Sequence, residues 1–480
     1  TLYELAKEVN GRILMLIHRS NCVEQFKYEI ERDGKADVID VRTYQSLEYG
    51  SLHNTKNQIN LSDYKYIVSD EFHYFFNDSS FNNKTAISFQ MIMNSTDTIH
   101  IFMSATGEHM TRYMEKYIKE NNLKEAIEYE IPFDFSFIRQ LTFFHKDVTM
   151  EEFIKEGIEQ GDKGIFFIQS AEKAYKLYSK FKKHCVFNCS ANNKKYYKYV
   201  DEDTIKNILK NERFEEQFLI TTSCFDAGIN IIDREVKHIV IDIVDIGSLI
   251  QCMGRKRIQD KEDDVNIYIK IINNQKLAGL RRSIQQKVEM ADFYIKSDYS
   301  VEQLLKKYPR ENDVNNILYD VLLYDVDGNI IANSYTKKVN ELMYFKKKED
   351  ILDYGIMMEE YGKFGYCKFL ARIFGYFNEE TGAYNYRMIK EEYELNEYLE
   401  RIVQNENVFL QIKDRKELIE KINARQDGKL LKKVSTLNQV LEEKELDYRI
   451  KQFATTRYLT DKFGNKKKKI YKHAWKVVRF

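Results

Sequence analysis

Up to about residue 275, short runs of β-branched and other apolar residues alternate with amphipathic stretches. This alternation is typical of βαβ units built around a parallel sheet. The periodicity breaks around Pro132, in residues 131–137 (IPFDFSF), and a second alternating set then begins. The sequence therefore predicts an α/β fold with two parallel-sheet lobes and a cleft between them. Ligands of such sheets bind at the carboxyl ends of the strands.

We expect three regions: a lobe over 1–135, a second lobe over 136–275, and a mostly helical domain over 276–480 that ends in a basic, aromatic segment. Within the third region, Asp327-Gly328 indicates a hairpin turn. Strands and helices are predicted from apolar runs and from helical periodicity, respectively. The strands are expected at 12–17, 66–68, 98–103, 164–168, 218–221, 236–243 and 265–272, and the helices at 2–8, 22–31, 171–182 and 201–211.

Charge and composition exclude some classes of protein. The chain carries 75 basic and 75 acidic residues, so its net charge does not indicate a nucleic-acid partner, although residues 461–480 are strongly basic. With 43% hydrophobic and 31% charged residues and no apolar run of membrane-spanning length, we expect a globular protein without a membrane segment. The six cysteines are scattered and no signal peptide is visible, so a reducing, cytoplasmic location is expected.

Polar residues follow several of the predicted strands. Asp70-Glu71-Phe72-His73 comes directly after a buried strand, where one carboxylate could hold Mg²⁺ and the other could orient an attacking water. The next strand ends in Ser104-Ala105-Thr106. In the second lobe, the segment from Thr222 to Asn230 follows a strand, and a helix opens with the segment from Gln251 to Arg257. An arginine presented across a cleft can stabilise the charge of a transferring γ-phosphate.

In this order, the segments resemble motifs II, III, V and VI of the superfamily 2 helicases of the DExH/DEAD-box type. Residues 13–19 (ILMLIHR) are similar to motif Ia, and 41–47 (VRTYQSL) to the next nucleic-acid-contacting segment. The resemblance covers about residues 1–275 and implies two RecA-like lobes that use ATP and Mg²⁺. The resemblance implies that the catalytic residues are Asp70, Glu71, Arg255 and Arg257, and that Asp70 and Thr1 bind magnesium. It implies further nucleotide contacts from Thr1, His73, Gly228, Asn230 and Gln251. The nucleic-acid contacts that it implies come from Arg19, Thr43 and Thr222.

The sequence departs from the family pattern in two places. No G-x-x-x-x-G-K-[ST] phosphate loop occurs, although such a loop cradles the phosphates of ATP. Because the chain begins with Thr1 and continues into a helix, we expect a truncation just after the lysine of a Gly-Lys-Thr, with an arbitrary terminus as the alternative. In motif VI, the usual position of the second arginine holds Ile258, and Arg257 comes one residue early. Arg255 is therefore the better candidate for the arginine that reaches the phosphate.

Several other features of the sequence have to be weighed against a purely structural role. His73 could be a structural histidine, whereas the resemblance implies that it couples the nucleotide site to Ser104 and Thr106. Cys185 and Cys189 have no second pair at zinc-site spacing. A calcium loop at 325–336 fails because Ile330 and Thr336 occupy the positions of the required Gly and the bidentate Glu.

The C-terminal segment 457–480 mixes lysines with aromatic residues, including the only tryptophan, Trp475. It could be a hairpin that turns at Gly464-Asn465 and stacks bases on its aromatic residues. The sequence slightly favours the alternative, a solvated lysine turn whose aromatic side chains pack on the protein.

The sequence as a whole favours an ATP-dependent helicase or translocase on single- or double-stranded nucleic acid, DNA rather than RNA. Protein partners through 276–480 are a further expectation. As given, the chain is expected to be inactive in ATP hydrolysis, since the essential lysine is absent. Two alternatives stay open: a nucleic-acid-binding module that keeps the fold without turnover, and the motor part of a restriction or defence system.

Overall fold

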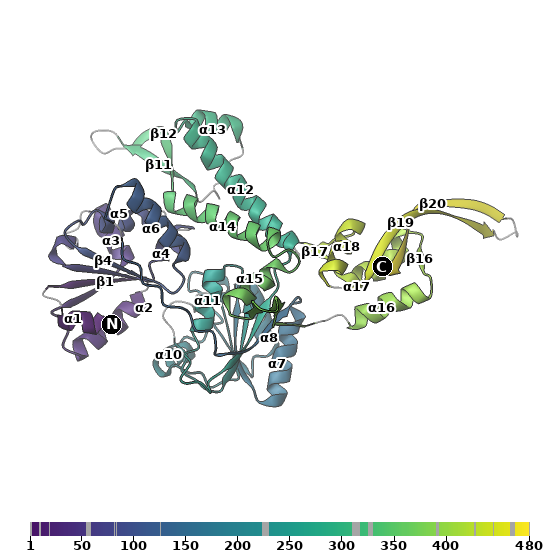
Figure 1. Cartoon of the computed structure of the whole chain (residues 1–480), viewed down its shortest axis with the longest axis horizontal. Coiled ribbons are helices and arrows are strands. Elements are labelled where there is room, and N and C mark those ends of the chain that lie inside the picture. Colours follow the sequence, from purple (N-terminus) through teal and green to yellow (C-terminus); the bar gives the residue numbers. More distant parts are fainter. Residues whose placement is uncertain are drawn as a thin grey trace.

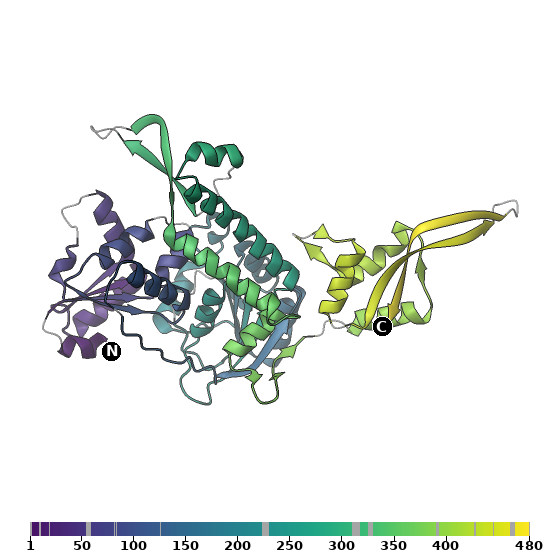
Figure 2. The same ribbon diagram turned by 45° about the horizontal axis from the view of Figure 1, so that its top comes forward.

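The structure is a computed structural model in which the described residues form two α/β lobes, a helical segment across them, and a separate C-terminal unit (Figures 1 and 2). None of the described helices is both long and apolar enough to cross a membrane. The structure describes residues 2–8, 11–18, 20–53, 59–80, 82, 84–124, 126–222, 230–309, 317–324, 330–389, 393–426, 429–444, 446–460 and 466–479.

The first lobe contains a parallel sheet with the strand order β2-β1-β3-β4. Its central strand β1 is buried at all five positions, because helices cover both faces of the sheet and two apolar cores form on them. The strands are β1 (Ile13–Ile17), β2 (Ile39–Thr43), β3 (Tyr66–Asp70) and β4 (Ile99–Met103). The helices are α1 (Leu2–Glu8), α2 (Ser20–Arg32), α3 (Tyr44–His53), α4 (Tyr74–Asn77), α5 (Thr85–Met93) and α6 (Glu108–Glu120), with 3₁₀ turns at Leu61–Asp63 and Asp78–Ser80.

The second lobe contains a parallel sheet with the order β15-β5-β10-β9-β6-β8-β7. Its edge strand β15 comes from far along the chain and pairs with β5, so residues beyond 275 complete this sheet. The strands are β5 (Ile138–Phe144), β6 (Lys163–Ile168), β7 (Cys185–Phe187), β8 (Phe218–Thr221), β9 (Val236–Asp242), β10 (Val265–Lys270) and β15 (Arg387–Met388). The helices are α7 (Val148–Gln160), α8 (Ala171–Lys180), α9 (Lys194–Tyr197), α10 (Glu202–Asn211) and α11 (Ile246–Gly254).

A helical segment lies across both lobes. Its helix α14 buries Leu342 in the core of the first lobe and Met357 in the core of the second. Arg112 of α6 pairs with Glu349 at 2.6 Å, which adds a polar contact between α14 and the first lobe. The segment comprises α12 (Asn274–Lys296), α13 (Val301–Lys307), β11 (Leu318–Tyr324), β12 (Ile330–Val339), α14 (Glu341–Glu359), α15 (Gly365–Ile373), β13 (Phe377–Asn378) and β14 (Ala383–Tyr384).

The C-terminal unit has its own apolar core and lies to one side of the lobes in Figures 1 and 2. The helix α16 is followed by β16, α17, the hairpin β17–β18, α18, β19 and β20, and β20 pairs with both β16 and β19. The elements are α16 (Tyr393–Gln404), β16 (Val408–Phe409), a 3₁₀ turn (Ile412–Arg415), α17 (Lys416–Ile422), β17 (Arg425–Gln426), β18 (Lys429–Leu430), α18 (Val434–Glu443), β19 (Tyr448–Thr460) and β20 (Lys466–Arg479).

The expectation of a mostly helical C-terminal region is wrong. The region contains antiparallel strands, including the long β19–β20 hairpin that projects away from the lobes (Figure 2). The outer part of this hairpin is exposed on β19 at Arg457 and Tyr458 and on β20 at Lys468 and Lys469. This outer part has no buried face and so shows no alternation of apolar and polar residues, whereas the inner part buries Tyr448, Ile450, Trp475 and Val477 in the core of the unit. The turn expected at Gly464-Asn465 and the residues Asp327-Gly328 lie outside the described residues.

Candidate functional site

The acidic pair lies at the carboxyl end of β3. Asp70 is the last residue of the strand, and its backbone carbonyl accepts a hydrogen bond of 2.8 Å from the buried hydroxyl of Tyr44. Burial raises the pKa of the Asp70 carboxyl above its usual value. Glu71 follows with a backbone φ of 50°, in the left-handed region that non-glycine residues seldom adopt. Such conformations gather at functional sites, where surrounding structure holds them in place.

His73 connects the acidic pair to the end of the neighbouring strand. Its Nδ1 lies 2.7 Å from Ser104 Oγ and 3.3 Å from Glu71 Oε2. Ser104 Oγ also accepts a hydrogen bond of 3.1 Å from the backbone N–H of Thr106. The contact expected between His73 and the segment Ser104-Ala105-Thr106 is therefore present.

Gln251 reaches the same histidine from the second lobe. It lies on α11, and its amide Nε2 is 2.6 Å from His73 Nε2 and 3.3 Å from Thr106 Oγ1. An amide N–H₂ only donates, so His73 Nε2 accepts from Gln251 and Nδ1 carries the proton that is donated to Ser104 Oγ. A Cβ added at Gly247, near the start of α11, would lie 3.8 Å from Thr106 Cβ, so the lobes approach closely here. The two lobes are thus joined by hydrogen bonds directly beside the acidic pair.

The protonation state of His73 follows from its surroundings. Burial, followed by the positive influence of His18, lowers the pKa of His73 from 6.5 to about 4, and Arg255 acts in the same direction. Asp245 and Asp78 oppose this shift without overcoming it. At neutral pH the ring is therefore uncharged, as the hydrogen bond from Gln251 requires, and its contact with the Glu71 carboxylate is not an ion pair.

This lowered pKa predicts a dependence of stability on pH. The folded-state pKa of His73 lies below the unfolded-state value, so the neutral ring contributes fully above about pH 6.5 and its contribution is lost as pH falls toward 4. The loss amounts to about 3 kcal/mol. We expect His73→Gln to remove this part of the pH dependence. Urea unfolding of both proteins at pH 7.0, 5.5 and 4.5 measures the free energy of unfolding at each pH. If that free energy depends on pH equally in the two proteins, His73 is not a buried, neutral histidine.

Two residues that the sequence did not single out hold α11 in place. Asp245 caps this helix, with its carboxylate accepting hydrogen bonds of 2.8 Å from the backbone N–H and the hydroxyl of Ser248. Burial alone would raise the pKa of Asp245, but Lys346 and the Ser248 hydrogen bonds outweigh it and lower the pKa. Lys346 Nζ comes from α14 and lies 3.7 Å from Asp245 Oδ1. An aspartate three residues before Ser248 is a helix-start signal that the sequence offered. The distant lysine gave no such signal.

The two arginines of motif VI differ in environment. Arg255 is buried, whereas Arg257 is exposed and donates from Nε to Asn230 Oδ1 at 2.7 Å. Lys256 between them forms a fully buried ion pair with Asp263, at 2.5 Å. The structure therefore brings Arg257 and Asn230 together, and places Arg255 close enough to His73 for its charge to influence the histidine.

Two of the three residues expected to contact nucleic acid, Thr43 and Thr222, lie at strand ends. Thr43 ends β2, and its Oγ1 accepts a hydrogen bond of 3.1 Å from the backbone N–H of Ser46, so the hydroxyl also supports the start of α3. Thr222 is buried just after β8. The other predicted site residues, Thr1, Arg19 and Gly228, lie outside the described residues.

Neither a protein-family model nor a curated protein matches this chain. Among solved structures it resembles superfamily 2 DEAD/DEAH-box helicases at low identity. S. cerevisiae Dbp5 bound to RNA and ADP BeF3 is 17% identical over 56% of this chain and 72% of that chain, with a TM-score of 0.39. Mycobacterium smegmatis helicase Lhr bound to ssDNA and AMP-PNP is 14% identical over 59% of this chain and 43% of that chain, with a TM-score of 0.40. DEAD-box helicase Mss116 bound to ssRNA and UDP-BeF is 13% identical over 64% of this chain and 75% of that chain, with a TM-score of 0.41.

Proposed function

We propose that this chain is the two-lobed core of an ATP-dependent helicase or translocase that moves on nucleic acid, DNA rather than RNA. The observation that carries the proposal is the hydrogen-bonded contact of His73 with Gln251, made between the lobes and next to Asp70 and Glu71. Any change at the acidic pair that moves His73 changes the contact between the lobes. A site with this property can couple nucleotide turnover to lobe movement.

The acidic pair suits Mg²⁺ bound together with ATP. Among the described residues, no group of three or more His, Cys, Asp or Glu side chains could hold a metal ion. A site with so few protein ligands suits magnesium, because this ion is commonly bound by one or two carboxylates together with substrate phosphates and waters. Asp70 would hold the ion, which would neutralise charge on the phosphates. Thr1 is the second ligand that the sequence suggests.

The other residues have separate roles in this proposal. Glu71 orients a water and accepts its proton, while His73 and Ser104 fix the end of β3 against β4. Arg255 or Arg257 supplies positive charge from the second lobe. Arg257 is the exposed one of the two and is steadied by Asn230. The preference that the motif pattern gives to Arg255 thus competes with the greater accessibility of Arg257.

Nucleic-acid-stimulated ATP hydrolysis tests this function. The protein is assayed as its gene encodes it, including whatever precedes Thr1, with single-stranded DNA, single-stranded RNA or neither. We expect turnover that rises with DNA more than with RNA. The variant Gln251→Ala should lower stimulated turnover more than basal turnover, because it removes the hydrogen bonds to His73 and Thr106 that join the lobes. Folded protein that binds nucleic acid but shows no turnover under any condition would refute the motor and leave a binding module.

A further inference from the structure

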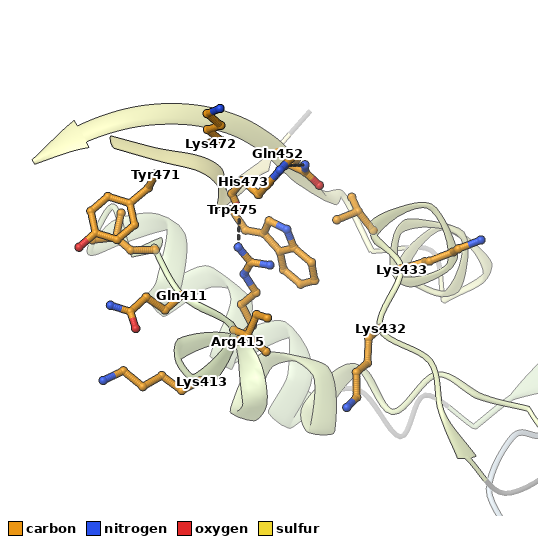
Figure 3. A pocket seen from close by; sticks show the side chains of 13 residues that line it. Gln411, Lys413, Arg415, Lys432, Lys433, Gln452, Tyr471, Lys472, His473 and Trp475 are labelled. Atoms are coloured by element: carbon orange, nitrogen blue, oxygen red, sulfur yellow. Dashed lines mark hydrogen bonds between the residues drawn. The ribbon is translucent and has the colours of Figure 1, made fainter. Parts of the chain in front are cut away.

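The C-terminal unit contains an open groove of about 820 Å³ whose described lining residues include no carboxylate (Figure 3). It lies between the 3₁₀ turn that precedes α17, the segment that leads into α18, and the strand β20. Its basic lining residues are Lys413, Arg415, Lys432, Lys433 and Lys472. A concave surface lined by cations alone among its charged groups attracts anions.

Arg415 lies in the middle of the groove. Its guanidinium stacks over the Trp475 ring, 4.3 Å from the ring centroid, and donates to the backbone carbonyl of His473 (Figure 3). Burial lowers the pKa of Arg415, which means that its charge is partly desolvated. Arg415 Nε and Trp475 Nε1 are both buried and meet no acceptor among the described residues. Buried donors without acceptors cost free energy that a bound anion would recover.

The neighbouring hairpin places like charges opposite one another. Arg457 pairs with Lys469 across β19 and β20, and Lys451 pairs with Lys476. Directly opposed like charges destabilise a hairpin. A polyanion laid along the ribbon would offset this repulsion, and the exposed Lys468 extends the same basic surface.

The orientation of α18 indicates how a polyanion would be held. The carboxyl end of α18 is turned toward the lobes, since Glu443 accepts a hydrogen bond of 3.0 Å from Asn273 just before α12. The amino end, preceded by Lys432 and Lys433, borders the groove. Lys432 and Lys433 thus precede α18 instead of lying on it. We expect lysines placed in this way to contact phosphates of a nucleic acid more readily than the edges of its bases.

We propose that this groove and the adjoining ribbon bind the phosphate backbone of nucleic acid, independently of base sequence, at a second site outside the two lobes. The proposal does not depend on whether the lobes hydrolyse ATP. Phosphate contacts give affinity that falls steeply with salt concentration. A second binding site away from the lobes would hold one part of a nucleic acid while the lobes act on another part.

The test replaces the four exposed lysines of the groove in the full chain: Lys413→Gln, Lys432→Gln, Lys433→Gln and Lys472→Gln together. The matched control carries the same charge change on exposed lysines of the lobes: Lys119→Gln, Lys182→Gln, Lys183→Gln and Lys210→Gln. Binding of a 30-nucleotide single strand and of a 30-base-pair duplex is measured by fluorescence anisotropy at several salt concentrations. The groove variant should bind at least one of the two about tenfold more weakly, with a salt dependence shallower by roughly 2 to 4 in the log–log slope.

A second measurement keeps the proposal falsifiable if the groove variant is poorly folded. A photo-crosslinking amino acid replaces Ile412, which lines the groove and is 77% exposed, or Leu209 on α10 of the second lobe as a control. Irradiation should crosslink the Ile412 derivative to labelled nucleic acid. Absence of this crosslink, or a groove variant that keeps the affinity and salt slope of the control, would overturn the proposed site.

Discussion

Replacement of Glu71 by glutamine is expected to lower nucleic-acid-stimulated ATP hydrolysis by about 10²- to 10⁴-fold, the range for losing a general base. Glu71 directly follows β3 with φ 50°, and its carboxylate lies 3.3 Å from the Nδ1 of His73. Glutamine keeps the size of the side chain but cannot accept a proton from water. Nucleic-acid binding and the melting temperature should stay close to those of the unmodified protein, because neither depends on proton transfer.

The control for this variant is Glu115→Gln, which removes an exposed carboxylate from α6 of the same lobe. It should hydrolyse ATP at the unmodified rate. Steady-state turnover with saturating DNA, measured for both variants in parallel, separates the two outcomes. A Glu71→Gln protein that retains turnover within about twofold of the unmodified protein would exclude Glu71 from the chemistry.

Replacement of Asp263 by alanine is expected to lower the free energy of unfolding by about 3 to 5 kcal/mol, the cost of leaving one member of a buried ion pair without its partner. Asp263 Oδ2 lies 2.5 Å from Lys256 Nζ, and both side chains are fully buried. The same oxygen accepts a hydrogen bond of 3.0 Å from the backbone N–H of Gln259. Lys256 lies between Arg255 and Arg257, so the loss should also disturb the placement of both arginines.

Urea unfolding followed by circular dichroism measures the stability change. Trp475 is the only tryptophan and lies in the core of the C-terminal unit, so its fluorescence reports separately on that unit and should change little. The matched control is the double variant Lys256→Met with Asp263→Leu, which replaces the pair with apolar side chains and should recover most of the stability. Equal destabilisation of the single and double variants would show that the site requires the charges themselves.

Most strands of the two lobes, but fewer than half of their helices, could be predicted from the sequence. The helix expected at 2–8 is α1, the strand at 218–221 is β8, and the other predicted strands agree with the observed ones within two residues at each end. These elements are buried on one or both sides, so each carries a periodic apolar pattern. The strands β2, β5, β7 and β15 were not predicted. Of these, β2 is short and contains Asp40 and Arg42.

The site could be predicted only in part. The resemblance to the helicase motifs is why His73 was expected near Ser104 and Thr106, and its Nδ1 lies 2.7 Å from Ser104 Oγ. The partner of His73 in the second lobe, Gln251, came from a motif and not from periodicity. Glu71's backbone conformation and the buried state of Arg255 depend on packing, and the sequence carries no signal for either.

The sequence by itself determined the two parallel sheets, because burial on both faces imposes long apolar strands whatever else the chain does. It also determined which polar residues stand at the strand ends. The tertiary structure alone decided that α14 joins the two lobes, that Lys346 supports α11 from 100 residues away, and that the C-terminal region is a sheet-containing unit with a basic groove. Those features arise from contacts between distant segments and from an exposed ribbon, and neither leaves a local periodic pattern in the sequence.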